Sequence, residues 1–339
     1  MTTMGNTMST VSIETAANSS SVLLSIIVPM YNEETNVEEF YRRIKTSLDE
    51  IDPSWEVICI NDGSSDSTLL RLVTLHKTDA RIKVINFSRN FGKEIALTAG
   101  LDKAAGQVVV PIDADLQDPP ELIKELLDKW REGYDIVNAT RRIRHGESWF
   151  KRFTAEKFYR WINRISDVEI PENTGDFRLL SRRVVDAIKL LPERSRFMKG
   201  LFAWVGFRQA TVYYDRHPRY AGKTKWNYWR LWNFAIEGIT SFSTIPLKIW
   251  SYFGFVLAFF SFLYALYLVI RTLMFGKDWP GYASTMVAIL FIGGIQLISL
   301  GVIGEYLGRV FTEVKKRPLY LVENCYGFDE DRPHDEAIG

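Results

Sequence analysis

Two long stretches without charge near the end of the chain constrain its fold most. Residues 249–270 and 279–304 are runs of 22 and 26 positions that contain no Asp, Glu, Lys or Arg. Each run exceeds the roughly 20 residues that an α-helix needs to cross the ~30 Å hydrocarbon core of a membrane. Only residues 271–278 separate the runs, so they predict a helical hairpin whose two ends lie on one side of a membrane. A buried hairpin in a soluble core is the alternative, although a core helix seldom needs this length.

Basic residues are more frequent outside this hairpin than in its turn. The turn holds Arg271 and Lys277, and Lys248 precedes the first run. Four basic residues follow the second run: Arg309, Lys315, Lys316 and Arg317. Because basic residues are enriched in cytoplasmic segments, this distribution predicts a multi-pass protein of the inner (cell) membrane with both chain ends in the cytoplasm.

The rest of the chain has the composition of a soluble domain. Of the 83 charged side chains, only three lie between residues 249 and 304. The net charge of +1 argues against a strongly basic nucleic-acid binder, so no nucleic-acid partner is expected. Cys59 and Cys325 are far apart in the sequence and indicate neither a disulfide scaffold nor a zinc cluster. Residues 1–21 lack the basic start and apolar run of a secretory signal and are interpreted as part of a disordered tail.

Apolar runs alternate with helical patterns from Leu23 onward. The runs predict strands over five ranges: 24–29, 56–60, 83–87, 107–112 and 134–139. Helices are predicted between them, over 34–50, 67–78, 93–104 and 120–131. Strands that alternate with helices predict an α/β fold, Rossmann-like, with a mostly parallel sheet and helices on both faces. Ligands of such sheets bind beyond the carboxyl ends of the strands. Further on, a helix is predicted over 149–165, a strand over 177–180 and a helix over 182–190.

The strongest local motif is a pair of acids at the end of the fourth predicted strand. Asp113 and Asp115 flank Ala114, and Gln117 follows. Hard oxygen ligands of this kind suit Mg²⁺ or Mn²⁺ together with phosphate oxygens, which makes Asp113, Asp115 and Gln117 the candidate metal ligands. A polar turn with an Asp N-cap is the alternative interpretation.

Two further motifs follow the first and second strands. Asp62 ends the second strand, where its carboxylate can accept a hydrogen bond from a nucleobase or ribose. Pro29 and Tyr31 follow the first strand and can line a base pocket, and Glu33 either joins them or is a first-turn helix acid. No G-x-G-x-x-G follows the first strand and no G-x-x-x-x-G-K-[ST] is present, which argues against a dinucleotide enzyme and a P-loop NTPase.

The motifs together resemble a known family. Residues 25–34, 61–68 and 113–121 are similar to the hallmark segments of family 2 glycosyltransferases of the GT-A fold, and the similarity continues through 173–180 and 219–226. With the hairpin, the chain resembles the polyprenyl-phosphate glycosyltransferases over about residues 23–320. This resemblance implies a nucleotide sugar as donor and a polyprenyl phosphate as acceptor. Pro29, Tyr31, Glu33, Asp62, Asp113 and Ala114 are then expected to bind the nucleotide sugar.

An anionic lipid acceptor needs cations close to the membrane. Basic residues cluster around 141–152, around 178–183 and throughout 216–230, where no acid occurs. The expected lipid-phosphate ligands are Arg141, Arg152, Arg178, Arg219, Lys223 and Lys225. Solvated surface charges or lipid-headgroup anchors are the alternative for each of them, and the aromatic residues of 216–230 are typical of a membrane interface or of a soluble core helix.

The catalytic residues are expected to be Asp115 and Asp176. The resemblance places Asp176 near the acceptor, as a general base or as a residue that orients the sugar or Arg178; a capped turn is its structural alternative. A lipid phosphate is largely ionised at pH 7, so it is a ready nucleophile without a base.

The expected reaction is an inverting, metal-dependent transfer of a sugar, glucose by resemblance, from UDP-glucose to undecaprenyl phosphate. Transfer of mannose or a 4-amino-arabinose derivative, a processive polysaccharide synthase, and a non-catalytic membrane-tethered GT-A binding protein are the alternatives. Membrane lipid is an expected partner, and a homo-oligomer stays open.

The expected organisation has five parts. They are a disordered tail (1–22), the catalytic domain (23–215), a basic and aromatic interfacial segment (216–247), the transmembrane hairpin (248–308, with helices near 249–271 and 280–304) and a cytoplasmic tail (309–339).

Overall fold

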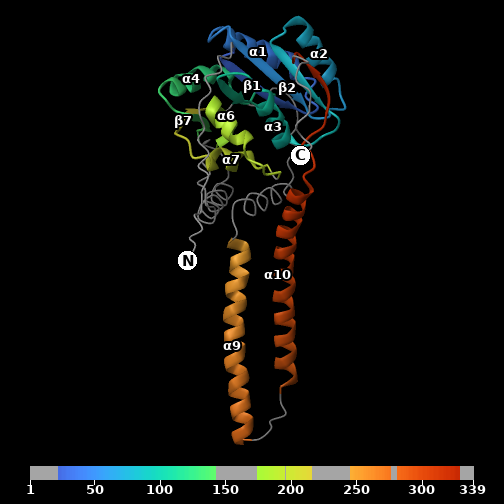
Figure 1. The fold of residues 1–339 in the computed structure, drawn as a ribbon, viewed down its shortest axis with the longest axis vertical. Coiled ribbons are helices and arrows are strands. Elements are labelled where there is room, and N and C mark those ends of the chain that lie inside the picture. The colour runs from blue at the N-terminus through green and yellow to red at the C-terminus, as the bar shows by residue number, and fades with distance from the viewer. Residues whose placement is uncertain (1–21, 143–173, 195, 216–244, 276–280, 329–339) are drawn as a thin grey trace, which may run out of the picture.

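An eight-stranded mixed sheet carries two long helices on one side in this computed structural model (Figure 1). The residues described are 22–142, 174–194, 196–215, 245–275 and 281–328. The predicted helix over 149–165 and most of the predicted interfacial segment fall outside them.

The predicted strands and helices of the first 141 residues are confirmed, with shifts of a few residues at their ends. The strands are β1 (Leu24–Met30), β2 (Trp55–Asn61), β3 (Ile82–Phe87), β4 (Val108–Pro111) and β5 (Ile136–Arg141). The helices are α1 (Val37–Asp49), α2 (Thr68–Thr78), α3 (Lys93–Lys103), the short 3₁₀ helix η1 (Pro120–Leu122) and α4 (Ile123–Arg131).

The later elements bring antiparallel strands into the sheet. They are β6 (Thr174–Ser181), α6 (Arg182–Lys189), α7 (Met198–Trp204), β7 (Gln209–Tyr214) and β8 (Val322–Tyr326). The strand order is β7-β5-β6-β4-β1-β2-β3-β8. β1 pairs in parallel with β2 and β4, β2 with β3, and β5 with β7, whereas β6 runs antiparallel to both β4 and β5.

Alternate residues of the buried strands pack into two hydrophobic cores, one on each face of the sheet. Ile26 and Val28 pack with α1, α2 and α4, while Ile27 packs with α3, α6 and α7. The second layer lies on the side from which the long helices extend (Figure 1). The expectation of helices on both faces is therefore confirmed.

A buried carboxylate ties three strands together at the amino ends of β1 and β2. Glu56 accepts hydrogen bonds from Ser25 Oγ at 2.5 Å and from the backbone N–H of Ala105 at 2.8 Å, and it pairs with Lys83 Nζ at 2.8 Å. These partners satisfy a charge that burial would otherwise penalise.

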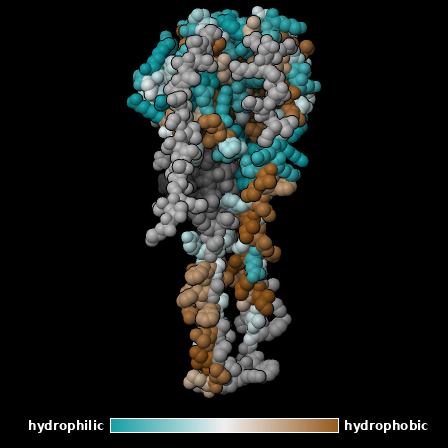
Figure 2. Space-filling model, viewed as in Figure 1, coloured by the Kyte–Doolittle hydropathy of each residue, from teal (hydrophilic) through white to brown (hydrophobic). Residues whose placement is uncertain are grey.

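Two long helices, α9 (Ile245–Phe275) and α10 (Tyr282–Lys315), lie side by side and extend away from the sheet (Figure 1). Their surfaces are largely apolar (Figure 2). Among the described residues, one segment, Phe291–Lys315, is long and apolar enough to cross a membrane, with a mean hydropathy of 1.4, and α9 contains the shorter apolar segment Tyr252–Tyr264. The structure thus contains the predicted pair of helices.

The end of the chain differs from the expected tail. β8 pairs antiparallel with β3, with Val84 opposite Tyr326 and Ile85 opposite Cys325. Tyr320 stacks on Phe87 with ring centroids 5.1 Å apart. This return of the chain to the sheet attaches the carboxyl end of α10 to the domain. No alternation of apolar residues marks the five positions of β8, because this edge strand is mostly exposed.

Leu72 and Leu70 on α2 provide a matched test of the packing. Leu72 is fully buried and Leu70 is 69% exposed. We expect Leu72→Ala to cost about 2–5 kcal/mol, because it leaves a cavity beside the sheet. Leu70→Ala removes the same atoms from water-exposed surface and serves as the control. Thermal unfolding of the purified chain in detergent measures both, and equal unfolding temperatures for the two variants would contradict this packing.

Candidate active site

The carboxyl ends of three neighbouring parallel strands form one rim of the sheet. β1 lies between β2 and β4, and the registers pair Met30 with Asn61 and Ile27 with Pro111. The loops after these strands therefore open on the same edge, where α/β folds bind ligands. All three sequence motifs begin on this rim.

Hydrogen bonds join the first two loops to each other. Asn32, at a left-handed φ of 53°, receives the N–H of Ser65 on its Oδ1 at 2.8 Å and donates its own N–H to Ser64 Oγ at 2.9 Å. The N–H of Glu33 bonds to Thr68 Oγ1 at 2.9 Å. These contacts hold Tyr31, which is 39% exposed, at the rim beside the partly buried Pro29.

Glu33 faces its own loop in this structure. Its Oε2 accepts a hydrogen bond from Asn36 Nδ2 at 2.6 Å, at the start of α1. This contact agrees with the first-turn interpretation and leaves the predicted nucleotide-sugar contact untested.

Asp62 fixes the loop that leads into α3. Its two carboxylate oxygens accept the N–H groups of Phe91 at 2.7 Å and Gly92 at 3.0 Å. Burial raises the pKa of Asp62, although these two hydrogen bonds act in the opposite direction. Gly63 lies so close to this loop that a Cβ would stand 2.4 Å from the carbonyl carbon of Arg89. The nucleotide role predicted for Asp62 stays a prediction.

Lys93, the first residue of α3, joins two carboxylates from different strands. Its Nζ lies 2.6 Å from Asp113 Oδ1, at the end of β4, and 2.5 Å from Asp176 Oδ2, on β6. Burial alone would lower the pKa of Lys93, but the two carboxylates raise it well above its ordinary value. Burial would likewise raise the pKa of Asp176, but Lys93 and Lys199 hold it well below its usual range. The predicted metal motif and Asp176 therefore meet at one ammonium group.

Glu94 is a third carboxylate close to this cluster. Glu94 accepts the N–H of Met198 at 3.1 Å, at the start of α7. Burial, together with the charge of Asp176, raises the pKa of Glu94 to about 7. A proton on Glu94 reduces the negative charge that Lys93 has to balance.

Arg178 lies in the protein interior, and its predicted contact to a lipid phosphate stays a prediction. It is 3% exposed, donates from Nη2 to the carbonyl of Gly175 at 2.8 Å, and places its guanidinium 4.4 Å from the ring centre of Phe202. Burial lowers the pKa of Arg178 to about 10, against the raising effect of Asp176 and Glu94. Its position suits an internal countercharge to these acids.

The acidic loop after β4 is turned back on itself. Ala114 is 4% exposed, Leu116 adopts a φ of 57°, and Asp115 Oδ1 accepts the N–H of Gln117 at 3.2 Å. These features place Asp113 and Asp115 on one short turn. Pro120 opens η1 shortly afterwards, as expected for a proline in a first helical turn.

Arg141 reaches the same loop from the end of β5. Its Nη2 lies 3.6 Å from Asp118, and its Nε donates to Tyr214 Oη at 3.2 Å. Tyr214 in turn donates to Asp118. Burial would lower the pKa of Arg141, but Asp118 raises it overall. Arg141 therefore lies beside the predicted metal motif with 30% of its side chain exposed, while its lipid contact stays untested.

A divalent metal fits the acids of this rim. The described residues contain no group of three or more His, Cys, Asp or Glu arranged around one point. Mg²⁺ is commonly held by one or two protein carboxylates together with substrate phosphates, so Asp113 and Asp115 suffice when a diphosphate supplies the other ligands. The Lys93 ammonium beside Asp113 indicates that this position favours a cation.

The remaining predicted lipid-phosphate residues lie outside the described part of the chain: Arg152, Arg219, Lys223 and Lys225. Sequence reasoning missed Lys93 and Glu94. Lys93 did carry a signal, because a cation in the first turn opposes the helix dipole and so points to an acidic tertiary partner.

The pKa of Glu94 leads to a pH prediction. Between about pH 4.5 and about pH 7 this carboxyl keeps its proton in the folded chain and loses it in the unfolded chain, so folding takes up a proton. Stability then falls as the pH rises through that window. We expect Glu94→Gln to remove this part of the pH dependence and to raise the unfolding temperature above pH 7.

Thermal unfolding in detergent across this pH range measures the effect. Glu125→Gln on α4, at an exposed position, is the control and should keep the wild-type pH dependence. A Glu94→Gln variant with an unchanged profile would contradict the raised pKa of Glu94.

Comparisons with known proteins agree with this architecture. Residues 25–189 match the family model "Glycosyl transferase family 2", and residues 245–310 match the model "GtrB C-terminal hairpin". An uncharacterised glycosyltransferase of Synechocystis sp. is 62% identical over 90% of this chain and 96% of its own length. A bactoprenol glucosyl transferase of Shigella flexneri, derived from prophage SfII, is 50% identical over 89% of this chain and 98% of its own.

Among solved structures, a mannosyltransferase from Pyrobaculum calidifontis in complex with GDP-Man and Mn²⁺ matches with a TM-score of 0.46 and 17% identity over 86% of each chain. The two family models and the near-complete coverage of relatives at 50% identity or more show that the chain belongs to the family 2 glycosyltransferases, in the group that carries a GtrB C-terminal hairpin.

Proposed function

We propose that this chain transfers glucose from UDP-glucose to a polyprenyl phosphate, undecaprenyl phosphate, at the cytoplasmic face of the inner membrane. The observation that carries the proposal is the 50% identity to a bactoprenol glucosyl transferase over 98% of that protein. The geometry supports it, because the acidic turn after β4 and the carboxylate on β6 lie within reach of one cation. The reaction is a single inverting displacement.

In this proposal the donor lies on the rim formed by β1, β2 and β4. The base and ribose lie against Pro29, Tyr31 and Glu33, with Asp62 at the floor, and the sugar diphosphate lies over Asp113 and Ala114. Mg²⁺ or Mn²⁺ would be held by Asp113, Asp115 and Gln117, and it would supply positive charge for the leaving nucleoside diphosphate. The ammonium of Lys93 lies beside this turn and adds a fixed positive charge.

Asp176 is better suited to orienting a substrate than to removing a proton. Its pKa lies well below the ordinary value, so its carboxylate is a weak base. A lipid monophosphate is already largely ionised at pH 7 and needs no base. The second oxygen of Asp176, Oδ1, is buried without a hydrogen-bond partner. A buried acceptor of this kind needs a donor, and a sugar hydroxyl on the bound substrate supplies one.

The hairpin places this site at the membrane in the proposal. α9 and α10 span the bilayer, residues 23–215 form the catalytic domain, and residues 216–247 lie at the membrane interface. Arg152, Arg219, Lys223 and Lys225 are proposed to attract the anionic acceptor, with Arg141 at the edge of the donor site.

One experiment tests the reaction as a whole. The purified chain is incubated in detergent with undecaprenyl phosphate, Mg²⁺ and a panel of nucleotide sugars, and the lipid product is identified by its mass. A hexosylated lipid phosphate formed from UDP-glucose is the expected product. A product from GDP-mannose or another donor alone would correct the sugar, and no product from any donor would contradict the transferase.

Asp115→Ala is expected to abolish turnover while the fold stays intact, because the acidic turn loses one of its two carboxylates. Asp128→Ala removes an exposed carboxylate on α4 and is the control. Turnover is measured at saturating Mg²⁺, with thermal unfolding to verify the fold. Wild-type activity of Asp115→Ala under these conditions would exclude its metal role.

The hairpin predicts that both chain ends face the cytoplasm. In right-side-out and inside-out vesicles, epitope tags at the two ends should become protease-sensitive together, and only when the cytoplasmic face is exposed. The turn near residues 271–278 should show the opposite accessibility. Ends that become sensitive in different vesicle orientations would refute the hairpin.

A further inference from the structure

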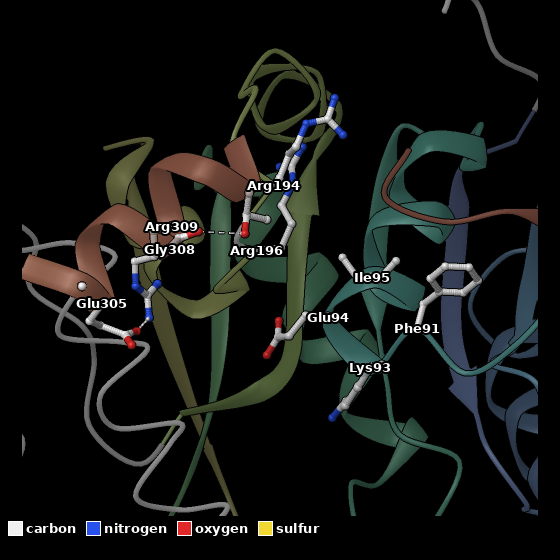
Figure 3. A pocket seen from close by; sticks show the side chains of 12 residues that line it. Phe91, Lys93, Glu94, Ile95, Arg194, Arg196, Glu305, Gly308 and Arg309 are labelled. Carbon is white, nitrogen blue, oxygen red and sulfur yellow. Dashed lines mark hydrogen bonds and ion pairs between the residues drawn. The ribbon is translucent and has the colours of Figure 1, made fainter. Parts of the chain in front are cut away.

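A cavity of about 570 Å³ lies where α10 meets the catalytic domain (Figure 3). Lys93 and Glu94 line it from the start of α3, and Glu305 and Arg309 line it from α10 on the opposite side. Arg194 and Arg196 contribute from the segment before α7. The backbone N–H of Arg194 bonds to Glu313 on α10 at 2.8 Å, so this segment and α10 are held together. The cavity thus adjoins the Lys93 cluster on the side of the long helices.

Basic side chains outnumber acidic ones among the residues that line the cavity, although Lys93 is already paired with Asp113 and Asp176. Lys93, Arg194, Arg196 and Arg309 are basic, and the acids that line the cavity are Glu94 and Glu305. Glu305 pairs with Arg309 at 3.2 Å. The raised pKa of Glu94 means that this acid is partly neutral near pH 7. An anion can therefore enter without meeting a full opposing charge.

Arg196 has donors that the described protein does not satisfy. It is 9% exposed, and its Nη2 donates to the carbonyl of Leu191 at 2.8 Å. Its Nε and Nη1 are buried and have no hydrogen-bond partner. A buried cation with unused donors is costly unless a ligand completes it, and the guanidinium fork matches a phosphate group. Arg196 therefore gives the cavity donors that can bind an anion.

The wall formed by α10 continues into an apolar cavity. Gly304 and Gly308 line the first cavity and have open space where a side chain would stand. Leu300, one helical turn before Gly304, lines a second cavity of about 470 Å³ between α9 and α10. None of the residues that line this second cavity is charged. A basic site beside an apolar one on the same helix suits a ligand with an anionic head and a hydrocarbon chain.

We propose that Arg196 and Arg309 bind the monophosphate head of the lipid acceptor in the cavity between α3 and α10, with its hydrocarbon chain between α9 and α10. This inference rests on the proposed function and adds to it a phosphate site outside the segments at 141–152 and 216–230. It places the acceptor phosphate next to Lys93, and so next to the acidic turn that receives the donor.

Binding of the lipid without any donor tests the inference. The full chain in detergent is titrated with undecaprenyl monophosphate, undecaprenol, inorganic phosphate and UDP, and bound ligand is measured by native mass spectrometry. The variants are Arg196→Gln, Arg196→Lys and Arg309→Gln. Lys315→Gln is the matched control, since it removes one positive charge from α10 outside the cavity.

We expect Arg196→Gln and Arg309→Gln each to weaken lipid monophosphate binding about tenfold to a hundredfold, the scale of one charge-assisted hydrogen bond. Arg196→Lys should restore part of the affinity, because it keeps the charge and loses the fork. Lys315→Gln should bind as wild type, and UDP affinity should be unchanged in all variants. Undecaprenol and inorganic phosphate should bind more weakly than the complete lipid monophosphate.

The inference would be overturned if both glutamine variants bound the lipid as tightly as wild type. It would also be overturned if they lost UDP binding and kept lipid binding. If Arg196→Gln lowers the unfolding temperature, Arg309→Gln on α10 decides the outcome. Sugar transfer by variants with unchanged lipid binding would refute this site and leave the proposed function intact. Arginine-dependent lipid binding without transfer from any donor would refute the proposed function and support the site.

Discussion

One ammonium group, that of Lys93, joins the acidic turn after β4 to the carboxylate on β6. Lys93 lies between Asp113 and Asp176, which belong to strand ends that are far apart in the sequence. Without this cation, Asp113, Asp176 and the half-buried Glu94 would repel each other, because all three can carry negative charge. The loop that carries Lys93 is in turn held by Asp62. The position of the acidic turn therefore depends on a chain of contacts that starts at the end of β2.

The antiparallel strand β6 supplies two members of the same cluster. β6 lies between β4 and β5, and it brings Asp176 and Arg178 beside the end of β4. Arg178 is buried, and its positive charge interacts with Asp176 and Glu94 from inside the protein. A buried acid with a low pKa and a buried arginine are each costly alone, and they become stable when they share one cluster.

The return of the chain to the sheet couples the helical pair to the site. After α10, Tyr320 donates to Asp102 at 3.0 Å and β8 pairs with β3, the strand that precedes α3. Glu313 near the end of α10 holds the segment of Arg194. Tyr320 thus contacts the carboxyl end of α3 and Glu313 contacts the segment before α7, so α10 is attached to the domain at both places.

The local sequence pattern determined much of the secondary structure of this protein. Apolar runs and helical periodicity predicted nine elements between residues 24 and 141, because parallel strands buried on both faces leave a continuous apolar signal. The acids at 62, 113 and 115 were predicted as site residues because they directly follow such strands, and the uncharged runs at 249–270 and 279–304 predicted the hairpin. Lys93, Glu94 and Arg196 were not predicted; the position of Lys93 in the first turn of a helix hints at an acidic partner, but nothing local identifies Asp113 or Asp176, which are 20 or more residues away. The burial of Arg178, the pairing of β8 and the cavity at α10 were decided by tertiary structure alone, because burial and charge balance depend on which segments the fold brings together.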